Sequence, residues 1–185
     1  MHARFVVFCG PMFSSKTTRL LSELDRYRIK KKDFICFKPK IDDRYSEGEI
    51  VTHSGMKIPA QLVESGDEIL FEIVNYKGEE RPIVAVDEAF MIPGCSDALT
   101  TLHQQGFTIL VSTIDLSASC TPFDEVTKIL PYATEVHKCS AVCNVCCDDA
   151  HYTYRKFDNT DLGEISVGGI DKYEPRCQRH HPYFE

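Results

Sequence analysis

Gly10-Pro11-Met12-Phe13-Ser14-Ser15-Lys16-Thr17 is the stretch that decides the fold. It follows a short apolar run, residues 4–9, which is typical of a buried strand, and it precedes apolar residues at helical spacing from 16 to about 32. Strand, loop, Lys-Thr and helix together are the context in which the pattern G-x-x-x-x-G-K-[ST] binds phosphate. We therefore expect backbone N–H groups and Lys16 to contact phosphates, and the Thr17 hydroxyl to ligate Mg²⁺.

Ser15 departs from this pattern, which has glycine at the same place. If the loop requires an unusual backbone conformation there, serine costs strain that glycine avoids. The alternative interpretation of the stretch is a serine-rich helix cap followed by an ordinary amphipathic helix.

The rest of the first two thirds alternates between strands and helices. Further strands are expected at 33–37, 81–88 and 107–113, helices at 66–77 (capped by Gly78) and 96–105, and a loop at 38–50. The strands are apolar throughout, which is typical of a mostly parallel sheet covered on both faces. The fold class predicted from the sequence is therefore α/β, with a phosphate-binding loop after the first strand.

Two carboxylates, Asp87 and Glu88, end the expected strand at 81–88. Ligands of open α/β sheets bind at the carboxyl ends of the strands. Asp87 is expected to face the phosphate-binding loop and hold Mg²⁺, and Glu88, which points elsewhere, can act as a base. Two solvated acids before a turn are the plainer alternative.

Composition limits the partners. The 185 residues carry a net charge of −7, which argues against a nucleic acid or an anionic membrane, and the basic run at 26–32 is interpreted as a solvated helix end. No apolar run approaches the length that spans a bilayer, and the amino terminus lacks the features of a signal peptide, so we expect a cytoplasmic protein.

Nine cysteines without a secretory signal favour metal ligation over disulfides. Cys143-x-x-Cys146 and Cys177-x-x-His180 form two close pairs, which suit a tetrahedral structural zinc site. Cys147 and His181 are adjacent rivals for two of these positions. We expect residues 1–136 to form the ATP-binding domain and 137–185 a small domain that requires a metal to be stable.

The chain resembles the type II (cytosolic-type) thymidine kinases over nearly its whole length. The matching stretches are Gly10-Pro11-Met12-Phe13-Ser14, Phe37-Lys38-Pro39-Lys40-Ile41-Asp42-Asp43-Arg44-Tyr45, Asp87-Glu88-Ala89, Pro122-Phe123, Ala141-Val142-Cys143, Tyr152-Thr153, Gly168-Gly169-Ile170-Asp171-Lys172-Tyr173 and Cys177-x-x-His180. An ordered set of this kind in one short chain is far more specific than any single motif.

The resemblance implies a RecA-like core, a zinc-ribbon-like domain and a lasso loop, about 158–173, whose backbone reads the thymine base. It also implies a homotetramer that transfers the γ-phosphoryl group of ATP to the 5′-hydroxyl of thymidine and is inhibited by thymidine triphosphate. The implied roles are catalysis by Glu88 and Arg44; ATP binding by residues 10–17 and Asp87; Mg²⁺ binding by Thr17, Asp42 and Asp87; and nucleoside binding by Met12, Phe123, Ser140, Val167, Gly168 and Tyr173.

Two further departures concern the nucleoside pocket. The family's Asp-Glu-Ala-Gln-Phe run reads Asp87-Glu88-Ala89-Phe90-Met91, and Ala118 stands where an aromatic residue is usual. Because of Phe90 and Ala118, a kinase that accepts other deoxynucleosides besides thymidine remains an alternative. Because of Ser15, a regulatory homologue that binds nucleotide but has little catalytic activity remains another. A zinc-ribbon nucleic-acid module fused to an ATPase is a third possibility, which the acidic balance disfavours.

Overall fold

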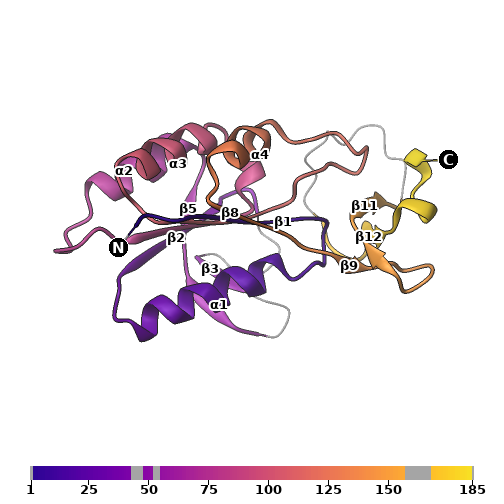
Figure 1. The fold of residues 1–185 in the computed structure, drawn as a ribbon, viewed down its shortest axis with the longest axis horizontal. Helices are drawn as coiled ribbons and strands as arrows, with labels where there is room; N and C mark the ends of the chain where they lie inside the picture. Colours follow the sequence, from indigo (N-terminus) through magenta and orange to yellow (C-terminus); the bar gives the residue numbers. More distant parts are fainter. Residues whose placement is uncertain (1, 43–47, 52–54, 157–167, 185) are drawn as a thin grey trace.

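The computed structural model describes residues 2–42, 48–51, 55–156 and 168–184. Its centre is a six-stranded parallel sheet in the order β5-β2-β6-β7-β1-β8 (Figure 1). The strands are β1 (Phe5–Cys9), β2 (Phe34–Pro39), β5 (Gln61–Val63), β6 (Ile83–Asp87), β7 (Ile109–Thr113) and β8 (Glu135–Lys138). One strand, β7, therefore separates the strand before the phosphate-binding loop from the strand that ends in Asp87.

Helices cover both faces of the sheet. α1 (Lys16–Ile29) lies on one face, and α2 (Gly66–Val74), α3 (Cys95–Gln104) and α4 (Asp124–Ile129) lie on the other (Figure 1). Alternation along β1 produces the two cores, because Val6 packs with Leu20 and Leu24 of α1, whereas Phe5 packs with Leu99 of α3. The predicted α/β class with a parallel sheet is confirmed.

Several element ends differ from the expectations. α1 ends at Ile29 instead of continuing to about 32, and Lys31 has a left-handed φ of 56°. α2 ends at Val74, and the residue that caps it is Asn75, so the expected cap at Gly78 is wrong. β2 extends into the expected loop as far as Pro39, because Lys38 and Pro39 pair with β5.

Several short helices and strands were not predicted from the sequence. A hairpin of β3 (Glu49–Val51) and β4 (Lys57–Pro59) lies within the expected loop at 38–50 and just after it, and its Ile50 and Ile58 enter the α1-side core. α4, the short 3₁₀ helices η1 (Ala89–Met91) and η2 (Leu130–Tyr132), and strand β8 complete the main domain. β8 pairs with β1 as far as Lys138, two residues beyond the expected boundary at 136. The division into domains stays a prediction.

The carboxyl-terminal part consists of two small hairpins at one end of the sheet (Figure 1). β9 (Ala141–Val142) pairs with β10 (Asp149–Ala150), and β11 (Tyr152–Arg155) pairs with β12 (Tyr173–Arg176); η3 (Gln178–His180) and η4 (Pro182–Phe184) follow. The expected lasso at 158–173 lies mostly outside the described residues. Arg155 and Tyr173 are paired partners, so the two ends of the segment between them are adjacent.

Candidate active site and metal centre

The phosphate-binding loop occupies the carboxyl end of β1, as the sequence predicts. Gly10 begins it with φ of 143°, and a Cβ atom at this position would lie 2.4 Å from the carbonyl oxygen of Cys139. Only glycine allows this approach. The segment after β8 therefore packs directly against the start of the loop, and Cys139 N–H donates to the Cys9 carbonyl at 2.7 Å.

Lys16, the first residue of α1, is buried and turns back over the loop. Its Nζ donates to the Pro11 carbonyl at 2.6 Å, and the Ser14 hydroxyl donates to the same oxygen at 2.8 Å. Burial lowers the pKa of Lys16, although the carboxylates of Glu88 and Asp87 act in the opposite direction. A buried ammonium group at a helix N-terminus is suited to binding a phosphate anion.

Ser15 adopts a left-handed backbone conformation, with φ of 59° and ψ of 26°. Non-glycine residues rarely occupy this region, and the strain costs about 1 kcal/mol or more. The sequence identified Ser15 as the residue at which such a conformation would matter, and the structure shows that the loop requires it.

Thr17 and Asp87 meet between α1 and the end of β6. The Thr17 hydroxyl lies 3.1 Å and 3.2 Å from the two carboxylate oxygens of Asp87, and the side chain of buried Asp42 borders the same cavity. Oxygen donors from a hydroxyl and two carboxylates are the ligands that Mg²⁺ prefers. The three predicted Mg²⁺ residues therefore fit such an ion.

Asp87 has an unusual acidity. Burial, together with the adjacent charge of Glu88, raises the pKa of Asp87 to about 7, although hydrogen bonds from Ser112 and Thr17 oppose the shift. Two buried carboxylates repel each other and favour a proton on one of them. A bound cation would remove this repulsion, which is a second indication that the pair faces a cation site.

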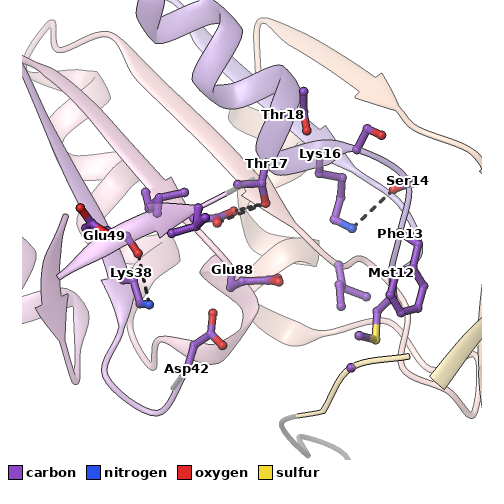
Figure 2. Close-up of a pocket in the computed structure, with 16 residues that line it drawn as sticks. Met12, Phe13, Ser14, Lys16, Thr17, Thr18, Lys38, Asp42, Glu49 and Glu88 are labelled. Carbon is purple, nitrogen blue, oxygen red and sulfur yellow. Dashed lines mark hydrogen bonds between the residues drawn. The ribbon is translucent and has the colours of Figure 1, made fainter. Parts of the chain in front are cut away.

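Glu88 follows β6 in a left-handed conformation, with φ of 52° and ψ of 44°. Its side chain is buried. Asp87 and Glu88 both border the cavity, and the backbone of Glu88 is strained. In Figure 2 the side chains of Glu88, Lys16 and Asp42 border one cavity.

Part of the wall of that cavity belongs to an apolar cluster. Met12 and Ile114 belong to both the cavity wall and the cluster, which also contains Phe90, Phe123 and Tyr173. The rings of Phe90 and Phe123 lie 4.5 Å apart, centroid to centroid, at 39°. Three of the residues implied for nucleoside binding, Met12, Phe123 and Tyr173, are thus brought together beside the phosphate-binding loop.

The remaining implied residues behave differently. Gly168 is described, and its neighbour Gly169 borders the cavity. Ser140 is exposed, and its hydroxyl donates to Asp149 at 3.3 Å, away from the apolar cluster. Arg44 and Val167 lie outside the described residues, so their roles stay predictions.

Sequence reasoning missed Lys38 as a residue of the site. Lys38 is buried at the carboxyl end of β2, borders the cavity, and its Nζ lies 3.4 Å from the Glu49 carbonyl (Figure 2). The sequence did offer a signal for Lys38, which is a charged residue near the carboxyl end of an otherwise apolar strand. Polar residues at the carboxyl edge of a parallel sheet commonly face ligands. Thr153 was also missed; its hydroxyl accepts the Met12 N–H at 3.0 Å and ties β11 to the loop.

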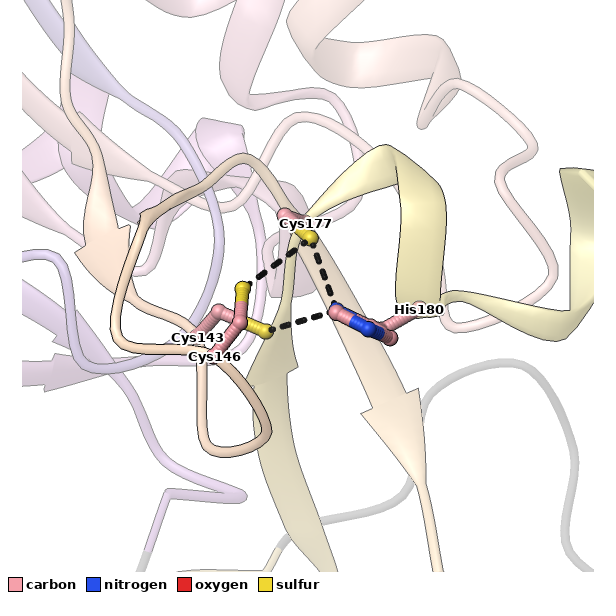
Figure 3. Close-up of side chains that lie close together, drawn as sticks. All are labelled: Cys143, Cys146, Cys177 and His180. Atoms are coloured by element: carbon pink, nitrogen blue, oxygen red, sulfur yellow. Dashed lines mark hydrogen bonds between the residues drawn. The ribbon is translucent and has the colours of Figure 1, made fainter.

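The four predicted zinc ligands converge between the two carboxyl-terminal hairpins (Figure 3). Their ligand atoms all lie within 4.8 Å of one another. Three pairs of ligand atoms are in contact: Cys146 Sγ to Cys177 Sγ at 3.7 Å, Cys177 Sγ to His180 Nδ1 at 3.2 Å, and Cys143 Sγ to His180 Nδ1 at 3.9 Å. Bond lengths to tetrahedral zinc place ligand atoms roughly 3.5–3.8 Å apart, so the set has the right size.

The chemistry of the donors also fits a metal. Burial acts to raise the pKa of the Cys143 thiol, but backbone N–H groups of Cys177, Val145 and Cys146 outweigh it and lower the pKa to about 6. A thiolate is the form that binds zinc. The rivals lie elsewhere: Cys147 is exposed, and His181 lies against the Thr153 carbonyl, with its Nε2 at 3.2 Å.

A parallel sheet, a phosphate-binding loop after its first strand and paired acids at the end of β6 define a P-loop nucleotide-binding protein. The family model described as thymidine kinase matches residues 3–181. The chain therefore belongs to the thymidine kinase family, whose members are ATP-dependent kinases that phosphorylate thymidine. Within the described residues, no helix combines the length and the apolar character needed to cross a bilayer.

Proposed function

We propose that the cavity of Figure 2 holds ATP and thymidine together and that Glu88 is the catalytic base. One observation carries the proposal: Glu88 borders the same cavity as Lys16, and two residues of that cavity's wall, Met12 and Ile114, belong to the apolar cluster that contains Phe123. If the ATP triphosphate lies on the Lys16 side and the thymine ring lies against the apolar cluster, the sugar 5′-hydroxyl lies beside the Glu88 carboxylate.

The proposed step is an in-line displacement. The Glu88 carboxylate accepts the proton of the 5′-hydroxyl, the sugar oxygen bonds to the γ-phosphorus, and the bond to the β–γ bridging oxygen breaks to release ADP. Lys16 and the loop N–H groups neutralise the phosphate oxygens. Mg²⁺, when held by Thr17, Asp42 and Asp87, supplies further charge neutralisation. The acceleration comes mainly from positioning and electrostatics.

Replacement of Glu88 by glutamine tests the assignment. The amide keeps the size of the side chain but cannot take the proton, and loss of a general base typically costs about 10²–10⁴-fold in turnover. We expect kcat for thymidine to fall by that factor while ATP affinity, measured by calorimetry, stays near the parent value. Glu79→Gln, on an exposed residue before β6, is the matched control and should change neither quantity. Unchanged turnover in Glu88→Gln would remove Glu88 from the mechanism.

The base preference is open to a second proposal, a kinase with relaxed specificity. The observation in its favour is that Phe90, which replaces a polar residue of the family pattern, is buried against Phe123, while the small Ala118 packs at the edge of the cluster. An apolar wall discriminates weakly between bases that differ by one methyl group. Comparison of kcat/KM for thymidine and deoxyuridine decides between the two.

We also propose, on the strength of the family alone, a cytoplasmic homotetramer that is inhibited by thymidine triphosphate, and, on the strength of the Cys143, Cys146, Cys177 and His180 cluster, a structural zinc ion. Light scattering, metal analysis and inhibition at varied thymidine concentration test these points separately from the catalytic assignment.

A further inference from the structure

A partly buried ion pair lies beyond the end of β1, beside the segment that packs on the phosphate-binding loop. Asp115, two residues after β7, pairs through Oδ2 with the Nζ of Lys138, the last residue of β8. The Asp115 side chain is 10% exposed and that of Lys138 is 48% exposed. The second carboxylate oxygen, Oδ1, is buried and has no hydrogen-bond partner within the described part of the chain. Lys138 therefore supplies the main compensation for a nearly buried charge.

Asp115 is the first residue of a loop that extends to the apolar cluster, and it is hydrogen-bonded to the last residue of that loop. Its carbonyl accepts the Phe123 N–H at 3.2 Å, and Leu116 and Pro122 form an antiparallel bridge just above. Phe123 and the loop residue Ala118 pack in the cluster with Met12. The backbone of Asp115 therefore joins the two ends of this loop, called here the 115–123 loop, and the Asp115 side chain links that junction to Lys138.

Lys138, on the other side of the ion pair, leads directly into the segment that packs on the phosphate-binding loop. The next residue, Cys139, donates its N–H to Cys9 and places its carbonyl against Gly10. The Asp115 carboxylate lies close enough to the end of β1 to reinforce the effect of burial, which raises the pKa of Cys9 to about 11. One ion pair thus joins β8, the end of β1 and the 115–123 loop.

We propose that Asp115 and Lys138 are positioning residues that hold the 115–123 loop, and with it Phe123, in register with the phosphate-binding loop. Neither side chain is among those that border the cavity, so the pair acts through the segments that it joins. The inference rests on the proposed placement of the nucleoside base beside Phe123. A pair with a purely stabilising role would affect both substrates alike.

The double variant Asp115→Asn, Lys138→Met tests the inference. It removes both charges, so the net charge around Lys16 is kept, while the anchor of the 115–123 loop is lost. We expect KM and the dissociation constant for thymidine to rise by about tenfold to a hundredfold, because misplacement of a substrate by about 1 Å can cost a hundredfold. KM for ATP should stay within about twofold, since the loop residues that bind phosphate are untouched.

Two further variants sharpen the result. Lys138→Arg keeps the charge and can still bridge the carboxylate, so it should retain most of the thymidine affinity. Glu80→Gln with Lys32→Met removes another ion pair, between the residues that precede β6 and β2 at the opposite end of the sheet, and should leave both KM values unchanged. If the double variant does not fold, Lys138→Gln serves instead, because the Lys138 side chain is half exposed.

The inference is overturned if thymidine KM is unchanged in folded variants, or if the KM values for thymidine and ATP rise together. An unmodified protein that binds ATP but does not phosphorylate thymidine would contradict the proposed function instead, and this baseline is measured first.

Discussion

Three residues of the site, Phe13, Ser15 and Glu88, have a positive φ, in a backbone region that only glycine adopts without strain. Strain of this kind persists where surrounding structure enforces it, and it is common at functional sites. The pattern around Lys16 indicated that Ser15 was in an unusual place. Nothing in the sequence indicated the conformation of Glu88, because the turn after β6 depends on η1, which Phe90 N–H ties to the Thr113 hydroxyl at the end of β7.

Ser15→Gly should therefore stabilise the protein. Glycine removes the strain but makes the unfolded chain more flexible, so we expect a net gain of about 0.5–1 kcal/mol in the free energy of unfolding. Ser22→Gly, at an exposed position within α1, is the matched control and should destabilise by a similar amount, since glycine is unfavourable inside a helix. Urea denaturation measures both. A loss of stability in Ser15→Gly would mean that the left-handed conformation is not strained.

Asp87 should make the metal-free protein sensitive to pH. Its folded pKa of about 7 lies above the ordinary value of 3.8, so the folded state holds this proton more tightly than the unfolded state. The stability contributed by Asp87 is thus complete below pH 3.8 and is lost as pH rises to about 7. The melting temperature without metal should decline over this range less steeply in Asp87→Asn.

The same proton competes with Mg²⁺. Because the carboxylate must lose it to bind a cation, the apparent Mg²⁺ affinity of the kinase reaction should rise as pH increases through 7. An affinity that is independent of pH between 6 and 8, with ATP binding held constant, would contradict the assignment of Asp87.

At the scale of elements, β1, β6 and β7 were predictable because each is mostly apolar and buried on both faces. β8 was not, because it is an edge strand in which Val136, His137 and Lys138 are all exposed and because its sequence, Glu-Val-His-Lys, is mostly polar. β3 and β4 have three residues each, too few for a periodic pattern. Local sequence determined the central strands, whereas pairing with distant residues determined the others.

The two carboxyl-terminal hairpins should depend on a metal that holds them together. Cys143 and Cys146 follow β9, whereas Cys177 and His180 follow β12, so removal of one thiolate uncouples them. Cys177→Ser should lose about one bound zinc per chain and lower the unfolding midpoint, because small domains derive much of their stability from the metal. Cys147→Ser, at an exposed cysteine outside the cluster, should keep both. Equal zinc content in the two variants would contradict the proposed ligand set.

For the molecule as a whole, the sequence predicted the identity of the motif residues better than it predicted the positions of residues in the fold. Lys16, Thr17, Asp87 and Glu88 were found from one loop and one strand end, since parallel strands bring their carboxyl ends to a common edge. Lys38 and the pair of Asp115 and Lys138 were missed, because no short pattern marks them. Their importance depends on strand order, in which β7 and β8 lie on either side of β1.

Gly10 shows how closely the two halves of this enzyme depend on each other. A single added methyl group there would meet the Cys139 carbonyl, which belongs to the connection toward the hairpins, and the two segments would have to separate. Such a change would displace the start of the phosphate-binding loop from the segment after β8, and so would alter the distance between donor and acceptor. An alanine at this position would thus lower activity by misalignment of the two substrates.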